Sequence, residues 1–414
     1  MNHTRETMSK PLDLSGLLDR IVKNGLEGLP LEDQLADFSE WIVASGFPMK
    51  RASMGVRTLH PQYGALTYLW RPGMDRAEYT PQERAVMARE TYLQSPIHHL
   101  VTSGQGTYRH RLDIAKELPF AILKEIRDEG MTDYAACLVR YDSMDDGSID
   151  DGENALQGVF FSCATDALNG FNPTQLQQLT DFLPHLAVAI KSRLTFEVAK
   201  TVAQTYLGQD AGKRVLTGEI IRGSIRSIDA VIWFCDLRGF TDLSDSLDGD
   251  QLILVLNLYL EILARPVEKR GGQILKFLGD GFLATFDLTG HPPTQICNQA
   301  LEGALELRED FHKINKLRTD AKLPTLGFGL ALHIGTVLYG NIGTDNRLDF
   351  TVVGPAVNEA SRIQDFCRPL DREILLSQAF KRNIDESAYK LTSLGVHELR
   401  GVSSSLELFS LAQI

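Results

Sequence analysis

Two aspartates of this chain stand where acids can hold a cation. Asp236 directly follows the apolar run 231–235, and Asp280 stands between Gly279 and Gly281 after a second apolar run. An acid buried inside a strand would need a partner, whereas two acids at strand ends can converge on a divalent cation beside a phosphate. The pair therefore predicts a divalent-metal site.

Each aspartate also has a purely structural explanation. Asp236 precedes the turn Arg238-Gly239 and a helix expected to begin near Thr241, so it can serve as a helix cap. Asp280, flanked by glycines, is typical of a tight hairpin turn. The metal interpretation gains support from the expected order of strand, two helices and hairpin, which can bring the end of the first strand beside the hairpin.

The turn after Asp236 adds a site for an anion. Backbone N–H groups at a helix N-terminus attract phosphate, and we assign this role to Gly239, Phe240 and Thr241. A metal-binding acid beside such amides is what a nucleoside triphosphate with its Mg²⁺ requires.

Three further polar residues have informative spacings. Asn358 and Arg362 stand four apart after Gly354, so in the expected helix they share a face and can reach one ligand. Taken alone, they are more typical of a solvated helix face than of a ligand site. Lys276 stands four before Asp280 in an otherwise apolar strand, where a lysine needs a partner.

The elements that position these residues form the second half of the chain. Periodicity predicts strands at 228–236, 272–278, 282–287, 326–337 and 349–353, with helices within 242–270 and at 294–317 and 356–366. This βαββαβ order with extensions predicts an α+β domain built on a split, ferredoxin-like sheet.

The first half predicts a separate α/β domain of antiparallel strands with flanking helices. The pattern gives helices near 12–21 and 31–44, strands at 51–59, 63–70, 133–141 and 155–163, and a long helix at 174–208. The long helix has one apolar face, so it connects the halves and can pair with its copy in a second chain. We expect an N-terminal segment (1–30), a regulatory domain (31–195), a helical linker (196–224) and a catalytic domain (225–414).

The motifs of the second half resemble a known family. The runs Phe234–Thr241, Lys276–Ala284 and Thr351–Arg362 are similar, in order and spacing, to the catalytic segments of class III nucleotidyl cyclases. The resemblance covers roughly residues 225–410, about one domain. It implies a ferredoxin-like cyclase fold and the conversion of a nucleoside triphosphate to its 3′,5′-cyclic monophosphate and pyrophosphate.

The resemblance also implies roles for single residues. Asp236 and Asp280, with Leu237 included in the set, would hold two Mg²⁺ or Mn²⁺ ions per active site. Asn358 would orient the ribose, and Arg362 would stabilise charge on the α-phosphate. Arg400, near the C-terminus, would contact the triphosphate, although a surface arginine is the alternative.

The residues at two positions indicate which base the site accepts. Lys276 matches the lysine of adenylate-making relatives, which donates to adenine N1, whereas guanylate-making relatives have a glutamate. Thr351 stands where many relatives have an aspartate, as in the threonine-type subgroup, and its hydroxyl can accept from the adenine amino group. Asp349 lies two residues earlier, in the wrong register. We therefore expect an adenylate cyclase acting on ATP, with guanylate cyclase as the alternative.

Family members place the metal aspartates on one chain and the other site residues on its partner. Because this chain carries both sets, the resemblance implies a head-to-tail homodimer with two equivalent sites. The segment 335–349 matches the family's dimerisation arm. A catalytically silent nucleotide-binding dimer is a further alternative, while a diguanylate synthase lacks support because its Gly-Gly-Asp/Glu-Glu-Phe run is absent.

The order of elements in the first half loosely resembles a GAF-type sensor, with no motif that fixes a ligand. Asp142, Asp146, Gly147 and Glu153 fit four positions of a calcium-loop pattern, but strands are expected on both sides, which favours an acidic hairpin tip. We interpret this half as a dimerising, GAF-like regulatory module.

Composition and charge exclude some classes of partner and indicate where the protein acts. A formal charge of −12 and a pI near 5.4 argue against nucleic-acid binding. The five cysteines have no metal-ligand spacing and indicate reduced thiols. No apolar run approaches the roughly 20 residues needed to cross a bilayer, and the first ten residues lack the apolar core of a signal peptide, so we expect a cytoplasmic protein.

Overall fold

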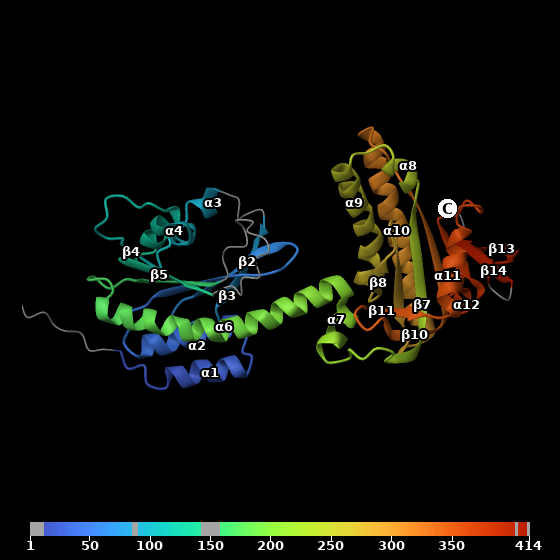
Figure 1. Cartoon of the computed structure of the whole chain (residues 1–414). Coiled ribbons are helices and arrows are strands. Elements are labelled where there is room, and N and C mark those ends of the chain that lie inside the picture. The colour runs from blue at the N-terminus through green and yellow to red at the C-terminus, as the bar shows by residue number, and fades with distance from the viewer. Residues whose placement is uncertain (1–11, 85–89, 142–157, 402–404, 412–414) are drawn as a thin grey trace, which may run out of the picture. The chain divides into compact units, whose positions relative to one another are not determined.

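The computed structural model describes residues 12–84, 90–141, 158–401 and 405–411 (Figure 1). The chain divides into two compact units, Met1–Val202 and Ala203–Ile414, and each is described by itself. The calcium-loop pattern at 142–153 lies outside the described residues. Among the helices that are described, none is long and apolar enough to cross a membrane.

The first unit is built on a six-stranded antiparallel sheet with the order β3-β2-β1-β6-β5-β4. Its strands are β1 Arg51–Arg57, β2 Tyr63–Trp70, β3 Glu78–Glu83, β4 Thr107–Arg111, β5 Asp133–Arg140 and β6 Gly158–Thr165. Its helices are α1 Leu17–Leu26, α2 Leu31–Ala44, α3 Glu90–Leu93, α4 Pro96–Ser103, α5 Ala121–Asp128 and α6 Pro173–Leu207. The sequence pattern does not predict β3 and β4, which are the polar edge strands of the sheet.

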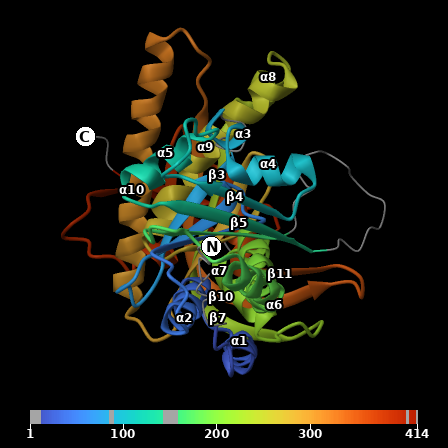
Figure 2. The ribbon, with the colours of Figure 1, turned by 90° about the vertical axis from the view of Figure 1, so that its left-hand side faces the viewer.

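Alternation along the strands gives this sheet two different faces. On one face, Met54, Val56 and Phe161 pack with α1, α2 and α6 in the larger core. On the other face, Leu138 and Phe160 pack with α4 and α5 in a smaller core. Figures 1 and 2 show the two groups of helices on opposite sides of the strands.

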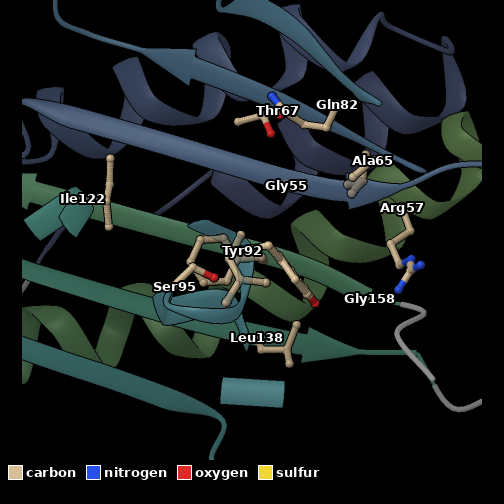
Figure 3. A pocket seen from close by; sticks show the side chains of 13 residues that line it. Gly55, Arg57, Ala65, Thr67, Gln82, Tyr92, Ser95, Ile122, Leu138 and Gly158 are labelled. Carbon is tan, nitrogen blue, oxygen red and sulfur yellow. The ribbon is translucent and has the colours of Figure 1, made fainter. Parts of the chain in front are cut away.

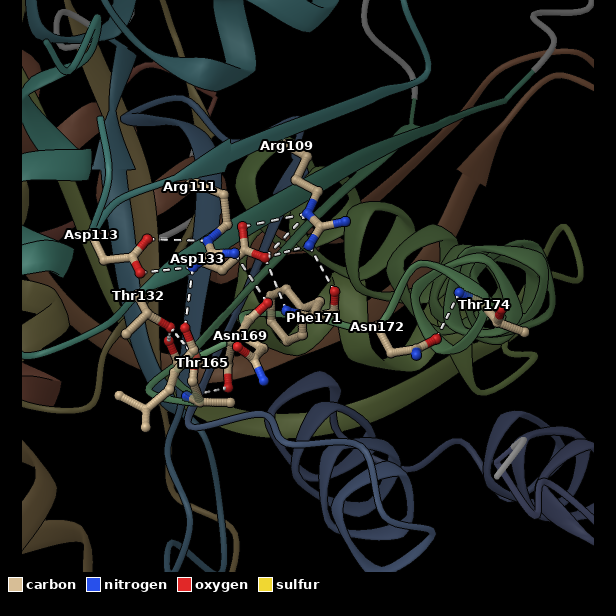
Figure 4. Close-up of polar contacts among 12 residues, drawn as sticks. Arg109, Arg111, Asp113, Thr132, Asp133, Thr165, Asn169, Phe171, Asn172 and Thr174 are labelled. Carbon is tan, nitrogen blue, oxygen red and sulfur yellow. Dashed lines mark hydrogen bonds and ion pairs between the residues drawn. The ribbon is translucent and has the colours of Figure 1, made fainter. Parts of the chain in front are cut away.

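The start of α6 is fixed to the sheet by a buried carboxylate (Figure 4). Asp133, on β5, is fully buried and accepts hydrogen bonds from Arg109 Nη2 at 2.7 Å and from the Phe171 amide at 2.9 Å. Asn172 Oδ1 accepts from the Thr174 amide at 2.9 Å and caps the first turn of α6. Because a buried charge is stable only when it is paired, this cluster holds the segment between β6 and α6 in one place.

The second unit contains an eight-stranded sheet with the order β13-β14-β12-β10-β7-β9-β8, and β11 pairs with the far part of β10. Its strands are β7 Ile225–Arg238, β8 Gln273–Phe277, β9 Gly281–Asp287, β10 Gly327–Gly343, β11 Leu348–Val353, β12 Ile374–Ser377, β13 Leu391–His397 and β14 Leu406–Leu411. Its helices are α7 Gln209–Leu216, α8 Phe240–Ser244, α9 Gly249–Lys269, α10 Pro293–Asp320, α11 Pro355–Asp365 and α12 Gln378–Lys381. The expected α+β class and the expected order of the elements are confirmed.

Helices cover both faces of this sheet (Figure 1). The fully buried Trp233 of β7 packs in the core that α9 and α10 share with the sheet, and α11 lies on the other face. β10 continues six residues past its expected end at 337, because its second part pairs with β11 to form a long hairpin. The helical linker expected at 196–224 is helical only through α6 and α7, to Leu216.

Candidate functional site

The two aspartates of the sequence motifs lie side by side. Asp236 pairs with Gly281 across β7 and β9, so Asp280 is the residue just before the paired position. The Leu237 amide donates to the Asp280 carbonyl at 3.3 Å, which ties the hairpin to β7. Burial raises the pKa of Asp236 to about 6, and the negative charge of Asp280 together with a hydrogen bond to its carboxyl adds to the rise.

Gly281 permits this arrangement because it has no side chain. A Cβ at position 281 would lie 2.2 Å from the Cys235 carbonyl oxygen and 2.6 Å from Asp236 Oδ1. Both distances are below any real contact of a Cβ atom, so a larger residue would push the hairpin away from β7. Gly279, with φ of 77°, provides the positive φ that a two-residue hairpin loop needs at its first central position.

The carboxylate of Asp236 points to the sheet face that carries α11. Asp236 pairs with Gly329 of β10, and directly paired residues of antiparallel strands share a face. A Cβ added at Gly329 would lie 2.9 Å from Gln364 and 3.1 Å from Cys367, at the end of α11. Asp365, the last residue of α11, is close enough to raise the pKa of Asp236 further.

The turn after β7 has the geometry expected for a helix start. Gly239 has φ of 82° and precedes α8, and the first intrahelical bond runs from the Leu243 amide to the Gly239 carbonyl at 3.2 Å. The amides of Phe240 and Thr241 therefore have no partner within the helix. Asp242 lies in the same first turn, so the local charge here is not uniformly favourable to phosphate.

Lys276 and Thr351 lie on β8 and β11, which contact each other. Thr351 is only 6% exposed, and its hydroxyl oxygen has no hydrogen-bond partner among the described residues. The four-residue spacing also predicts that Lys276 and Asp280 share one face of a strand, and the structure corrects this expectation. β8 ends at Phe277, so Asp280 lies in the turn, and Lys276 is exposed on an edge strand and not buried in an apolar one. Asp349 pairs with Ile342 and is exposed.

Asn358 and Arg362 share the exposed face of α11, as their spacing predicts. The opposite face is buried through Ala356, Ala360 and Ile363. Within the described residues, neither side chain bonds to the aspartate pair.

Arg362 has a partner on its own helix. Its Nη1 donates to Asp365 Oδ2 at 2.9 Å. Opposite charges at an i,i+3 spacing on a helix are typical of such a pair, so this contact is visible in the sequence.

α11 is anchored to β10 through a buried histidine. His333 is 4% exposed, its Nδ1 lies 2.8 Å from the Ser377 hydroxyl, and its Nε2 lies 3.1 Å from Glu359 Oε2. The hydrogen bond with His333 lowers the pKa of Glu359. Since Glu359 is the neighbour of Asn358, this contact fixes the position of the helix that carries Asn358 and Arg362.

Arg400 lies in the turn that follows β13 and is exposed. No ion pair joins it to another described residue, and the structure does not bring it into contact with the aspartate pair.

The residues present fit a divalent cation. No group of three or more His, Cys, Asp or Glu suited to a metal occurs in the part of the chain that the structure describes. Two neighbouring carboxylates, one with a raised pKa, nevertheless concentrate negative charge at the end of β7. Arg238 lies on the same sheet face, with its Nε 3.4 Å from the place of a Cβ at Gly329. Carboxylate oxygens suit Mg²⁺ or Mn²⁺, which need only one or two carboxylates when a substrate phosphate completes the coordination.

The paired carboxylates lie beside a helix start and beside α11, whose exposed face carries Arg362. Carboxylates with free backbone amides nearby are groups suited to a cation and a phosphate. Comparison with known proteins gives a family for this part of the chain. The family model described as "Adenylate and Guanylate cyclase catalytic domain" matches residues 225–413. A protein named adenylate cyclase from Anabaena cylindrica is 34% identical over 157 residues, which are 37% of this chain and 30% of that protein. Adenylate cyclase 2 of Rhizobium meliloti is 29% identical over 207 residues, which are 50% of this chain and 55% of that protein.

Solved structures of cyclases are similar to this chain at low identity. The adenylyl cyclase CyaB from P. aeruginosa is 24% identical, covers 46% of this chain and 97% of its own, and has a TM-score of 0.42. The guanylyl cyclase Cya2 is 26% identical, covers 47% and 95%, and has a TM-score of 0.40. The family match, which lies within the second unit, and the curated relatives support a class III adenylate/guanylate cyclase catalytic domain in that unit. The chain spans less than two thirds of the length of these curated relatives.

Proposed function

We propose that this chain is an adenylate cyclase that converts ATP to 3′,5′-cyclic AMP and pyrophosphate. The observation that carries the proposal is the juxtaposition of Asp236 and Asp280 in the cyclase domain. In the reaction, the ribose 3′-oxygen forms a bond to the α-phosphorus, and the bond from that phosphorus to the pyrophosphate oxygen breaks.

The roles of the residues follow from their chemistry. Asp236 and Asp280, with the Leu237 backbone, would hold two Mg²⁺ or Mn²⁺ ions. When bound, these ions would neutralise the triphosphate and lower the pKa of the 3′-hydroxyl. Asn358 orients the ribose by hydrogen bonding, and Arg362 stabilises the charge that develops on the α-phosphate.

Contacts with the phosphates come from two further places. The amides of Gly239, Phe240 and Thr241 and the guanidinium of Arg400 bind the triphosphate in this proposal. The pair between Arg362 and Asp365 has to open when Arg362 binds phosphate, which costs little because exposed pairs of this spacing contribute only about 0.3–0.5 kcal/mol.

Adenine is favoured over guanine by Lys276 and Thr351. An ammonium group can donate to adenine N1, and a hydroxyl can accept from the N6 amino group. The unpartnered buried hydroxyl of Thr351 supports this role, because a buried polar atom without a partner is costly until a ligand supplies one. The threonine at this position supports the assignment of the chain to the threonine-type subgroup. The second candidate is a guanylate cyclase, since the family match includes both activities.

A head-to-tail homodimer accounts for exposed apolar side chains near the site. Phe277 and Leu278, beside Asp280 in the hairpin, are 55% and 39% exposed. Leu338 and Val353, a cross-strand pair on the β10–β11 hairpin, are exposed to a similar degree. Exposed apolar groups of this kind mark an interaction surface. In the dimer, the aspartates of one chain meet Lys276, Asn358 and Arg362 of the other.

The first unit is proposed to be a GAF-like regulatory domain. Its six-stranded antiparallel sheet with helices on both faces supports this assignment. The apolar face of α6 that was expected to pair with a second chain packs in the core of the first unit through Leu183, Leu186 and Ile190. An exposed row of α6 has the alternating steps of four and three of a coiled-coil seam and includes two polar residues: Val188, Ser192, Thr195, Ala199, Val202 and Tyr206. We therefore propose that α6 pairs with its copy and transmits the state of the first unit to the cyclase domain.

Purified protein tests the reaction directly. Incubation with Mn²⁺ and ATP is expected to give cyclic AMP, and Asp280→Ala is expected to abolish the product. Production of cyclic GMP in preference to cyclic AMP, with both nucleotides competing, would establish the guanylate alternative. Nucleotide binding without any turnover would show instead a silent sensor.

Complementation tests the shared site. Asp280→Ala and Arg362→Ala are each expected to be inactive alone, because each damages both sites of its homodimer. Coexpressed in equal amounts, half of the dimers are mixed and contain one intact site, so activity is expected to return to about a quarter of the wild-type value. Absence of any recovery, with mixed dimers demonstrated by differential tags, would contradict the shared site.

A further inference from the structure

A cavity of about 370 Å³ lies in the first unit, on the sheet face away from the larger core (Figure 3). Strands β1, β2, β5 and β6 line one side, and the segment from α3 to α4 lines the other through Tyr92, Ser95 and Ile97. It belongs to a different compact unit from the cyclase site. Its volume lies within the range of roughly 300–1,000 Å³ that is usual for small-molecule sites.

Small residues on the strands create this cavity. Gly55 of β1 and Ala65 of β2 line it, where larger side chains would fill the space. Gly158 of β6 also lines it, but a Cβ there would lie 2.5 Å from the Val139 carbonyl oxygen, so the close approach of β5 requires this glycine. The neighbouring part of the same sheet face is filled instead, because Leu138 and Phe160 pack there against the helices. The sequence of the strands therefore leaves a gap at one place on an otherwise covered face.

The two ends of the cavity differ in polarity. Arg57 and the Tyr92 hydroxyl lie toward one end, and Ile122 lies at the opposite end (Figure 3). Burial raises the pKa of the Tyr92 hydroxyl, and the nearby charge of Arg57 partly offsets this rise. Arg57 forms no ion pair with any described residue. The N-terminal end of α4, capped by Ser95, also borders the cavity and adds its positive dipole end. Ile97 and Leu138 contribute to the apolar lining.

We propose that this cavity binds a small organic monocarboxylate with an apolar body. The carboxylate meets Arg57 and the Tyr92 hydroxyl, and the body extends along Leu138 toward Ile122. Arg57 is partly exposed at the more polar end of a largely apolar cavity, and Arg is the side chain best suited to bind a carboxylate through two hydrogen bonds. A volume of 370 Å³ corresponds to about a dozen water molecules, so the ligand has roughly ten to fifteen non-hydrogen atoms.

The position of the cavity suits a regulatory ligand of the proposed cyclase. Gly158 and Phe160 line the cavity from β6, and the same strand leads through residues 166–172 into α6. The far end of that connection is held by Asp133 through the Phe171 amide. Any effect on cyclase activity rests on the proposed function, whereas binding of the carboxylate does not.

Binding to the full chain can be measured without turnover. We would titrate phenylacetate into the protein by calorimetry and ligand-observed NMR, with phenylacetamide as the neutral probe of the same shape. Phenylacetate is expected to bind more tightly than phenylacetamide. Arg57→Met, which keeps the apolar stem, is expected to weaken phenylacetate about ten- to hundredfold and to leave phenylacetamide unchanged.

A cavity-filling variant provides the second test. Ala65 lies opposite Arg57 in the β1–β2 register, so Ala65→Leu is expected to abolish binding of both probes while the variant retains its circular dichroism spectrum. If neither probe binds wild-type protein at millimolar concentration, the cavity is not a site for this ligand class. Equal binding of the two probes, or an Arg57→Met variant with unchanged affinity for phenylacetate, would overturn the role of the anion.

Cyclase activity is a separate readout. Under the proposal, phenylacetate changes the rate of cyclic AMP formation in wild-type protein and has no effect on Arg57→Met at the same concentration. If wild-type protein forms no cyclic AMP at all, the proposed function is refuted, and the result of the binding experiment still stands. Binding with an unchanged rate would confirm the site and remove its link to regulation.

Discussion

Replacement of Asp280 by asparagine tests the paired-carboxylate site without any substrate. In metal-free protein, the pKa of Asp236 is raised from its ordinary value of 3.8 to about 6. Because the folded-state pKa is the higher one, the stability that this group contributes is complete below pH 3.8 and is lost as the pH rises through 6. At a pH of about 7.5 the folded protein therefore carries the full penalty of two adjacent charges.

The expected change in unfolding free energy follows from the shift in the pKa of Asp236. About two pKa units correspond to about 3 kcal/mol, and the partial exposure of Asp236 reduces this to about 1–2 kcal/mol. Burial is the largest cause of the shift and remains in the variant, so removal of the Asp280 charge is expected to recover about 1 kcal/mol. The amide group of the introduced asparagine can also donate a hydrogen bond to the ionised Asp236.

The assay is urea unfolding in EDTA at a pH of about 7.5, followed by hydrogen exchange in peptides from β7. Asp280→Asn is expected to unfold at higher urea than wild type, and the difference is expected to disappear near a pH of about 4. Mn²⁺ at a hundredfold excess over its dissociation constant should stabilise wild type by about 2.7 kcal/mol and should stabilise the variant much less. Asp349→Asn, an exposed acid of β11, is the matched control and should change neither result. An Asp280→Asn variant that is no more stable than wild type in EDTA, or that gains as much from Mn²⁺, would refute a shared cation.

Three further predictions concern base recognition, the catalytic helix and the first unit. Lys276→Glu is expected to lower ATP turnover at least about tenfold and to raise the ratio of GTP to ATP turnover in competition. Thr351→Val should lower kcat/KM for ATP about five- to tenfold and should raise the melting temperature of the ligand-free protein, because it removes a buried hydroxyl that has no partner. Glu359→Gln is expected to lower the unfolding free energy by about 1 kcal/mol, because it weakens the contact with His333. Since the pKa of Glu359 is lowered in the folded protein, denaturant titrations should show this difference vanish as the pH falls through that lowered pKa. Asp133→Ala is expected to destabilise the first unit by about 3 kcal/mol because it leaves the partly buried Arg109 without its partner, and calorimetry should show the transition of the second unit unchanged.

The sequence could predict the elements that carry strong periodicity. β7 and α11 were expected within three residues of their observed ends, because their apolar positions repeat with the period of a strand and of a helix. The shared face of Asn358 and Arg362 follows from the same helical period. The resemblance of three motifs to one family led to the same domain that the family match identifies.

Other features depend on contacts between distant segments, which periodicity does not report. Lys276 looked like a buried lysine, but β8 is an edge strand and a sequence pattern does not reveal the position of a strand in its sheet. The sequence explains Gly281 as a turn residue. In the structure, a side chain at this position is excluded by Cys235 and Asp236, which lie on another strand. The cavity beside Arg57 results from small residues on β1 and β2, and only the register brings those residues together.

The course of α6 determines how the protein can be divided for experiments. The boundary between the compact units, after Val202, falls inside this continuous helix of 35 residues. A cut there would expose backbone N–H and C=O groups that the intact helix pairs internally. Gly208, with φ of 87°, is the first natural break, and α7 after it belongs to the second unit because Tyr339 donates to Asp210 Oδ2 at 2.7 Å. A catalytic fragment should therefore begin at Gly208, and one that begins at Ile225, where the family match starts, would lack that contact.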